Sequence, residues 1–164
     1  MNENYAEQLI KRRTPAYAYA LTGVLGAVTA VTVVLAMTTG VLAVILMFLA
    51  GFVTYLSYRN THVEFEYLFV GGELSVDKIL GRSKRKKAFE CKMEEIQIVA
   101  PADSYVLNDY RNVKNTIDFS SHMEHAKMYA MIVQTKGEQT KVLLEPGEKM
   151  LTCMRQCSPR KVVV

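Results

Sequence analysis

The densest group of polar residues that could bind a ligand is a run of cations, which consists of Arg82, Lys84, Arg85, Lys86 and Lys87. Cations near a membrane attract anionic lipid headgroups, and each contributes on the order of 1 kcal/mol. The run therefore predicts contact with a lipid surface. The alternative is a solvated turn whose charge only helps to orient the chain in the membrane. A nucleic acid partner is not expected, because no aromatic residues for base stacking are interleaved with the cations.

Other spacings that could carry chemistry are incomplete. Ser83 and Lys86 match the S-x-x-K pattern of penicillin-recognising enzymes, but no S-D-N or K-T-G motif follows. His122 and His125 would supply two metal ligands, whereas a site needs three or four. Neither a Cys-His pair nor a Ser-His-Asp set can be assigned from the spacings. The sequence therefore predicts no catalytic residue, no metal site, no cofactor and no enzymatic activity.

The three cysteines, Cys91, Cys153 and Cys157, do not form a disulfide framework. Cys153 and Cys157 lie four apart on a predicted helix, where their β-carbons would be about 5–6 Å apart, too far for a relaxed bridge. Free thiols are typical of a reducing compartment, which favours the cytosol. We expect both helical cysteines to lie at the edge of a core.

The elements that must position these residues begin with an apolar stretch. Residues 14–58 contain no Asp, Glu, Lys, Arg or His. A membrane span needs roughly 20 mostly apolar residues, so this stretch is long enough for two spans. Thr38-Thr39-Gly40 supplies a break in its middle. We predict a transmembrane hairpin over residues 14–59, with helices at about 16–37 and 41–58, and a cleaved signal peptide is the less favoured alternative.

The flanks of the hairpin predict its orientation. Lys11-Arg12-Arg13 precedes it, and Arg59 follows it. Positive charge in short flanks marks the cytoplasmic side, and two spans return the chain to the side where it started. We therefore expect a multi-pass protein of the cell membrane with both termini in the cytoplasm. Four tyrosines near the ends of the two spans favour the same arrangement because tyrosine prefers the headgroup level: Tyr17, Tyr19, Tyr55 and Tyr58.

Small residues recur at helical spacing in the first span, and they are Thr22, Gly23, Gly26, Ala27 and Ala30. Small side chains at this spacing let two helices approach closely. The preferred interpretation is packing of the two hairpin helices against each other. The alternative is a homodimer that forms through the first span. Because neither span has an ionisable residue, we expect no ion pathway through the hairpin alone.

The pattern after residue 60 changes to that of a β domain. Val63, Phe65, Tyr67 and Phe69 recur with the period-two spacing of a strand that buries one face. Gly71-Gly72 predicts a hairpin turn, because glycine tolerates positive φ. Further strands are expected near residues 74–79, 87–93, 96–100, 115–119, 127–135 and 140–144. Residues 62–164 hold 16 Lys and Arg against 14 Asp and Glu, so this domain is close to neutral.

The C-terminal segment has the spacing of an amphipathic helix. Pro146 suits the first helical position, and one apolar stripe is expected to include Met150, Leu151, Met154 and Cys157. The sequence therefore divides into a cytoplasmic tail at 1–13, the hairpin at 14–59 and a cytoplasmic domain at 61–164. The fold class is a membrane α-helical hairpin plus a small, mainly β (α+β) domain.

About seven short strands followed by one helix resemble a pleckstrin-homology (PH)-like domain, a barrel of two sheets with a C-terminal helix. A small unrelated α+β domain is the alternative. The stretch from Glu64 to Lys87, EFEYLFVGGELSVDKILGRSKRKK, and the segment from Leu144 to Leu151 also resemble an uncharacterised family of small two-span membrane proteins from Gram-positive bacteria. That resemblance implies a PH-like cytoplasmic domain and brings no assigned activity.

Residues 101–125 form the longest stretch without clear periodicity, and long loops in compact domains are often functional. Tyr105, Tyr110 and Arg111 are its candidate contact residues for a protein partner. The sequence thus favours a non-enzymatic, membrane-anchored adaptor at the inner membrane face, with membrane lipid and a protein as its partners. An accessory subunit of a larger membrane transport or cell-envelope complex is the alternative.

Overall fold

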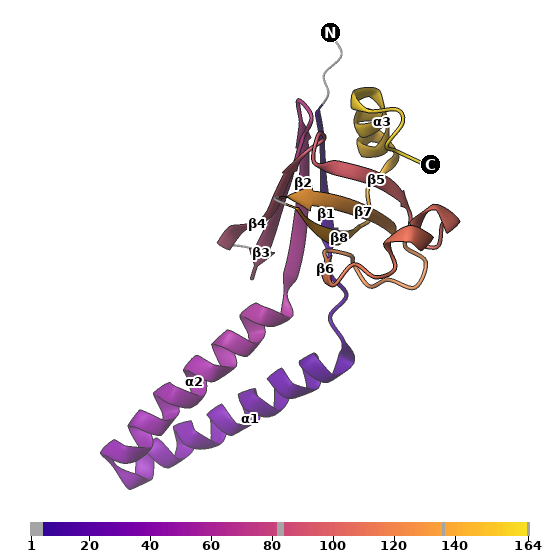
Figure 1. Ribbon diagram of the computed structural model, residues 1–164. Helices are drawn as coiled ribbons and strands as arrows, with labels where there is room; N and C mark the ends of the chain where they lie inside the picture. Colours follow the sequence, from indigo (N-terminus) through magenta and orange to yellow (C-terminus); the bar gives the residue numbers. More distant parts are fainter. Residues whose placement is uncertain (1–4, 82–83, 136, 164) are drawn as a thin grey trace. The chain divides into compact units, whose positions relative to one another are not determined.

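The computed structural model describes residues 5–81, 84–135 and 137–163. These residues form two compact units, whose elements are labelled in Figure 1. The hairpin unit comprises Arg13–Val63 and Leu80–Lys84, and the sheet unit comprises the remaining described residues. Arg82 and Ser83, which the sequence analysis singled out, lie outside the described residues.

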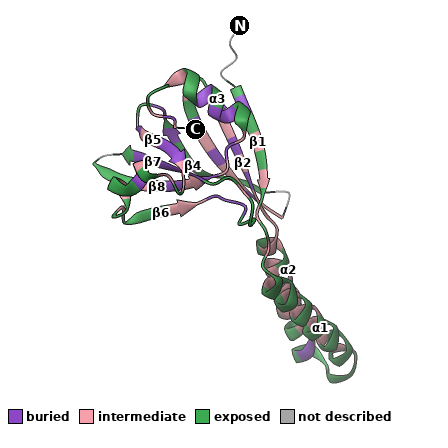
Figure 2. Cartoon of the chain, turned by 90° about the vertical axis from the view of Figure 1, so that its right-hand side faces the viewer, coloured by how far each residue is buried: buried purple, intermediate pink, exposed green. Residues whose placement is uncertain are grey.

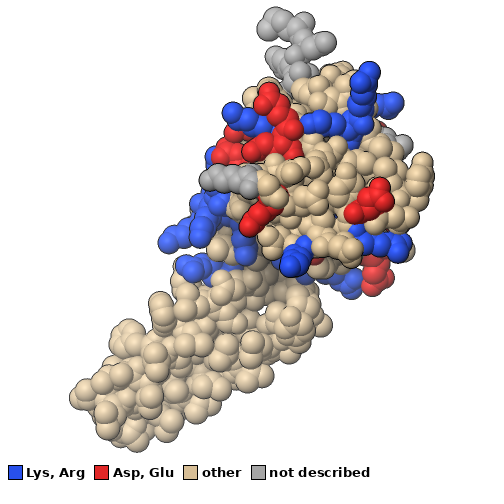
Figure 3. Space-filling view, in the orientation of Figure 1, with Lys and Arg blue, Asp and Glu red and all other residues tan. Residues whose placement is uncertain are grey.

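Two long helices make up most of the hairpin unit, α1 (Ala16–Thr39) and α2 (Val41–Thr61). They begin at the residues that the sequence predicted, and each ends slightly later than predicted. Gly40 separates them with φ +90°, a backbone conformation that favours glycine. Both helices are long and apolar enough to cross a membrane. Apart from Arg59 in the last turn of α2, the two helices have no charged residue, so they are drawn in tan in Figure 3.

Hydroxyl side chains join the two helices along the side where they meet. Thr22 Oγ1 lies 3.1 Å from Ser57 Oγ, and Thr29 Oγ1 lies 2.9 Å from Thr54 Oγ1. Hydrogen bonds of this kind between helices in a membrane contribute about 0.6 kcal/mol each. The two pairs therefore help to select which faces of α1 and α2 pack against each other.

The sheet unit contains two four-stranded sheets that cross each other in Figure 1. The first has the order β1-β2-β3-β4, and the second has the order β5-β7-β8-β6. The strands are β1 (Tyr5–Lys11), β2 (Val63–Val70), β3 (Glu73–Leu80), β4 (Lys84–Lys92), β5 (Ile96–Pro101), β6 (Asn115–Asp118), β7 (Tyr129–Thr135) and β8 (Glu138–Leu144). The PH-like arrangement is therefore built from two sheets and not from one closed barrel, and the described strands number eight instead of the predicted seven.

The additional strand is β1, which lies in the segment that the sequence predicted as a tail. β1 pairs antiparallel with β2, with Ala6 opposite Phe69 and Ile10 opposite Phe65. Ala6 is only 2% exposed. The prediction of a tail at residues 1–13 was therefore wrong for Tyr5–Lys11. The sequence did not reveal this strand, because Gln8 lies between these two apolar residues on the same face and interrupts the alternation. The hairpin is thus an insertion between two neighbouring strands of one sheet.

The core of the sheet unit follows the predicted period of β2. Phe65, Tyr67 and Phe69 are buried, and purple marks the buried residues in Figure 2. The Tyr67 hydroxyl donates a hydrogen bond of 2.7 Å to the carbonyl oxygen of Phe119, in the loop after β6. The rings of Phe65 and Phe119 meet edge to face, with centroids 5.3 Å apart. This core therefore ties the first sheet to a distant part of the chain.

The C-terminal helix α3 (Glu148–Cys157) begins two residues after Pro146, which the sequence had placed at its first position. Met150, Leu151 and Met154 are buried, as the predicted stripe requires, whereas Cys157 is half-buried. The side chain of Gln8 on β1 supports the start of α3. Its amide donates to the Glu145 carbonyl oxygen at 3.0 Å and accepts from the Gly147 N–H at 2.6 Å.

Candidate interaction surfaces

Three segments of the hairpin unit meet at the open end of the hairpin. Thr14 Oγ1, just before α1, donates to the carbonyl oxygen of Thr61 at the end of α2, at 2.7 Å. Gly81, in the turn after β3, donates its N–H to the carbonyl oxygen of His62 at 2.9 Å. A Cβ added to Gly81 would lie 3.0 Å from Arg59 Cγ, so the turn approaches α2 closely. The segment that leads into the basic run is therefore fixed beside the end of the second span.

Aromatic and charged side chains gather at this same end of the hairpin. His62 lies between two rings, with centroid distances of 6.3 Å to Tyr19 and 4.6 Å to Tyr58. The Arg59 guanidinium lies 6.0 Å from the Tyr55 ring centroid. Tyrosine and cationic side chains in this mixture are typical of the headgroup level of a membrane.

The described residues of the basic run, Lys84–Lys87, occupy the start of β4, an edge strand of the first sheet. Two of its cations are paired: Arg85 Nη1 lies 3.0 Å from Glu66 Oε2, and Lys87 Nζ lies 2.6 Å from Glu90 Oε1. The hydrogen bond between Lys87 and Glu90 raises the pKa of Lys87 and lowers the pKa of Glu90. Within the described part of the chain, exposed Lys84 and Lys86 have no carboxylate partner, so they supply the available charge.

The lysines at the edge of the first sheet can also be explained without any lipid contact. Exposed edges can pair with the strands of other molecules, and lysine on an edge discourages this pairing. The run therefore suits both lipid contact and protection of the β4 edge. Lys84 belongs to the hairpin unit together with Gly81 and Arg59, which favours lipid contact at this first described residue of the run.

The predicted partner loop at residues 101–125 is more ordered than its sequence suggested. It contains the 3-10 helix η1 (Tyr105–Tyr110) and the short strand β6, which pairs parallel to β8. Tyr105 is 82% exposed. Tyr110, in contrast, packs against a small cluster that includes buried Leu107, and Arg111 is exposed. Tyr105 and Arg111 are thus available for contact, whereas Tyr110 contributes to packing.

The two histidines of the loop do not share a helical face, because the described segment between β6 and β7 has no helix. His122 has φ +58°, which is unusual for a residue other than glycine. Its Nε2 lies 2.7 Å from Arg12 Nη2 and 3.2 Å from Asp118 Oδ2. This histidine, in the β6–β7 loop, therefore contacts the residue that follows β1 and the last residue of β6.

The small residues of α1 are divided between two faces. Thr22 contacts Ser57 across the hairpin, and Gly26 is half-buried. Gly23, Ala27 and Ala30 are exposed. Packing within the hairpin, the preferred interpretation of this stripe, therefore accounts for only part of it.

Cys91 and Cys153 are free thiols and are buried. Burial raises the pKa of the Cys91 thiol to about 12, and the nearby carboxylates of Glu95, Glu73 and Glu90 add to this effect. We therefore expect Cys91 to resist alkylation in the folded protein at pH 8, because the thiolate is the reactive form. Iodoacetamide labelling followed by mass spectrometry of the Cys91 peptide measures this. Labelling before denaturation as fast as after it would contradict the prediction.

Two crossing four-stranded sheets followed by a C-terminal helix define the chain as a PH-like protein, in which a helical hairpin follows the first strand. The chain belongs to the family DUF6106, described as a bacterial PH-like domain, which matches residues 2–164. This match confirms the predicted PH-like fold. The matched range includes the hairpin residues 14–61 as well as the strands on either side. Searches against curated proteins and against solved structures gave no match.

Proposed function

We propose that this protein is a non-enzymatic, membrane-anchored adaptor, in which the hairpin holds a PH-like domain at the inner face of the cell membrane and the domain binds a protein partner. The two apolar helices support membrane insertion, because each is long enough for one span. The PH-like family supports an interaction domain, although its description names no activity.

The observation that carries this proposal is the pairing of β1 with β2. Lys11 lies opposite Glu64, so the strands that enter and leave the hairpin are neighbours in one sheet. Two helices between neighbouring strands attach this sheet to the proposed membrane anchor through both of those strands. Lys11, Arg12 and Arg13 on one flank and Arg59 on the other favour the cytoplasm as the side of this sheet.

The test is gentle extraction of the tagged full-length protein from its native membrane, followed by identification of the proteins that accompany it. The adaptor proposal expects a stoichiometric protein partner. It also expects that a chain in which residues 14–61 are replaced by a short glycine-rich linker still binds the partner. Recovery of the full-length protein with lipid alone would contradict the adaptor proposal.

An accessory subunit of a larger membrane transport or cell-envelope complex is the second candidate function. Exposed Gly23, Ala27 and Ala30 favour it, because small residues on the outside of a hairpin suit close packing with another transmembrane helix. The same face would serve a homodimer. In the accessory-subunit case the partner is lost when the hairpin is removed, so the chain without the hairpin separates the two candidates.

Lipid contact through the start of β4 gives a separate prediction. We expect Lys84→Gln/Lys86→Gln to weaken attraction to anionic lipid by about 1 kcal/mol per lysine removed. Hydrogen exchange of residues 84–92 in the full-length protein measures the contact. Discs with phosphatidylglycerol should protect these amides more than phosphatidylcholine discs do, and the double variant should lose the difference.

The control for this prediction is Lys114→Gln/Lys149→Gln, which removes two exposed lysines outside the basic run. It should keep the dependence of protection on anionic lipid. Equal protection of residues 84–92 in both kinds of disc would show that the run serves only to protect the strand edge or to orient the chain.

A further inference from the structure

The segment that follows α3 pairs with the outer edge of β5. Residues 160–163, the strap, run parallel to β5, with Val162 opposite Val99. The Val99 N–H donates to the Lys161 carbonyl oxygen at 2.7 Å, and the Val163 N–H donates to the Val99 carbonyl oxygen at 2.8 Å. β5 is the edge strand of the second sheet on this side. The strap therefore occupies an edge to which an extended segment can add.

A cationic side chain fixes the start of the strap. Lys161 Nζ donates to the carbonyl oxygens of Met93 and Glu94, at 2.8 Å and 3.0 Å. Both carbonyls belong to the turn between β4 and β5. An ammonium group has three N–H donors and suits two converging carbonyl oxygens, whereas an ionised carboxylate has no donor for either. This position of the edge therefore favours a lysine and excludes an acidic residue.

The two valines of the strap pack in different apolar surroundings. Successive residues of an extended segment point to opposite faces of a sheet. Val162 is only 5% exposed. Val163 packs against a buried cluster that includes Ala100, Leu107 and Ile132. The edge therefore favours an apolar residue at both positions after the lysine, and β-branched side chains suit the extended backbone there.

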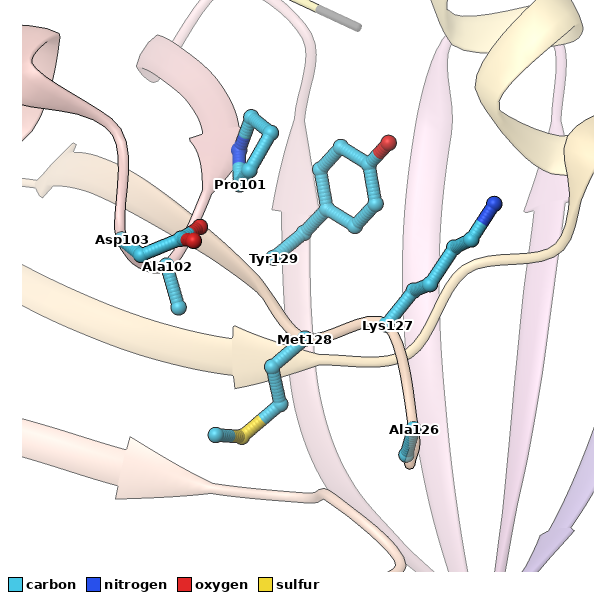
Figure 4. Close-up of a pocket in the computed structure, with 7 residues that line it drawn as sticks. All are labelled: Pro101, Ala102, Asp103, Ala126, Lys127, Met128 and Tyr129. Carbon is cyan, nitrogen blue, oxygen red and sulfur yellow. The ribbon is translucent and has the colours of Figure 1, made fainter. Parts of the chain in front are cut away.

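The edge available for pairing ends at Pro101. Residues two apart on a strand direct their backbone groups to the same side, so Pro101 follows Val99 along this edge. Proline has no N–H to donate, and the ladder of hydrogen bonds therefore stops there. Figure 4 shows Pro101 beside a cavity of about 370 Å³ at the end of β5. The segment that the edge recognises is consequently short.

The strap is attached less firmly than the strand on the other side of β5. β7 pairs with β5 from Ile96 to Pro101, whereas the described part of the strap pairs at Val99. A segment with few backbone hydrogen bonds opens locally while the rest of a fold stays intact. Tyr110 of the predicted partner loop packs against the same cluster as Val163. Opening of the strap therefore uncovers part of this loop together with the β5 edge.

We propose that the β5 edge binds an extended segment of the partner protein, in which a lysine is followed by two β-branched apolar residues. The strap closes this edge when the partner is absent. The inference rests on the proposed adaptor function and names the site and the partner's chemistry, because the strap itself shows which side chains the edge accepts. The sequence signal for the site is Lys161 followed by valines.

The test compares the full-length protein with a chain that ends at Pro159, both in phosphatidylcholine discs. The probe is a fluorescent peptide with the sequence of residues 158–164, SPRKVVV, blocked at both ends. Fluorescence anisotropy measures its binding, with empty discs as the blank. We expect the shortened chain to bind the peptide at least tenfold more tightly than the full-length protein, because the strap competes for the edge. Equal binding by both chains, or none by a folded shortened chain, would overturn the inference.

Two changes in the peptide separate recognition of the lysine from general attraction of charge. Lys161→Gln should weaken binding about tenfold or more, because hydrogen bonds from a charged group to two carbonyls are lost. Arg160→Gln is the matched control, since it removes the same charge one position earlier, where the side chain is exposed. It should bind as the unchanged peptide does. Equal weakening by the two changes would contradict the proposed site.

Hydrogen exchange of the full-length protein keeps the inference testable if the shortened chain does not fold. A strap that opens locally lets the Val99 and Val163 amides exchange at least tenfold faster than the Ile132 amide. Ile132 belongs to β7, which lies between two other strands. Exchange measured at single residues checks this difference. Equally slow exchange at all three amides would show that the strap is a permanent part of the sheet.

The native partner separates failure of this site from failure of the adaptor function. The shortened chain should recover more of the partner from the native membrane than the full-length protein does. A partner that accompanies both chains equally supports the adaptor and contradicts the site. A peptide that binds the shortened chain through its lysine, with no native partner for either chain, supports the site and contradicts the adaptor.

Discussion

A chain that begins at residue 61 will not fold, although the sequence suggests that residues 61–164 are the whole soluble domain. Without β1, strand β2 has an open edge beside Phe65, Tyr67 and Phe69. Each hydrogen bond of a strand pair contributes about 0.5–1.5 kcal/mol net. The loss of a seven-residue strand is therefore comparable to a total stability of about 5–15 kcal/mol. Circular dichroism and amide NMR dispersion of the purified fragment measure the outcome.

The matched control restores the strand and leaves out the membrane helices. Replacing residues 14–61 by a short glycine-rich linker turns β1 and β2 into an ordinary β-hairpin, because Lys11 and Glu64 are already opposite each other. We expect this chain to be soluble and folded, with dispersed amide resonances. Equal folding of the fragment that starts at residue 61 would show that β1 adds little.

Tyr67→Ala should lower the free energy of unfolding by about 3–5 kcal/mol, as large-to-small changes of buried aromatic residues do. Tyr67 is fully buried, and its hydroxyl bonds to the Phe119 carbonyl oxygen. Tyr67→Phe keeps the ring and leaves that carbonyl unpaired, so a smaller loss of about 1–3 kcal/mol is expected. Denaturant unfolding of the chain without the hairpin, followed by circular dichroism, measures both values.

Tyr105→Phe is the control for Tyr67, because Tyr105 is 82% exposed and its change should stay within about 0.5 kcal/mol. Burial also raises the pKa of Tyr67. The neutral phenol is therefore favoured by folding, and this contribution is complete below pH about 10 and is lost as the pH rises further. A loss for Tyr67→Phe equal to that for Tyr67→Ala would show that the hydrogen bond dominates the packing.

The parts of the fold that repeat a simple pattern were predictable. The uncharged stretch predicted both helices, and the alternation from Val63 to Phe69 predicted β2 with its buried face. β1 was missed because its inward positions include Gln8, whose hydrogen bonds reach Glu145 and Gly147, far away in the sequence. The parallel pairing of β6 with β8 was missed for a similar reason, since no local signal gives the direction of a strand.

The candidate surfaces were likewise only partly predictable from the sequence. The basic run was visible in the sequence, but its partial neutralisation by Glu66 and Glu90 depends on where the strands place these carboxylates. Tyr105 and Tyr110 looked equivalent in the sequence, because the loop has no periodicity. The structure distinguishes them, since only Tyr110 packs against the cluster that includes Leu107.

In the proposed membrane-anchored state, the hairpin between β1 and β2 makes pairing of these two strands depend on insertion of both helices. The ribosome releases β1 before α1 and α2, so β1 has no partner until the whole hairpin has been made. A chain that inserts only one helix leaves β1 and β2 on opposite sides of the bilayer, where they cannot pair. Its first sheet then lacks an edge strand, and its exposed apolar residues are available to proteases that remove unfolded chains. Under that proposal, a paired β1 and β2 requires that both helices have crossed the bilayer.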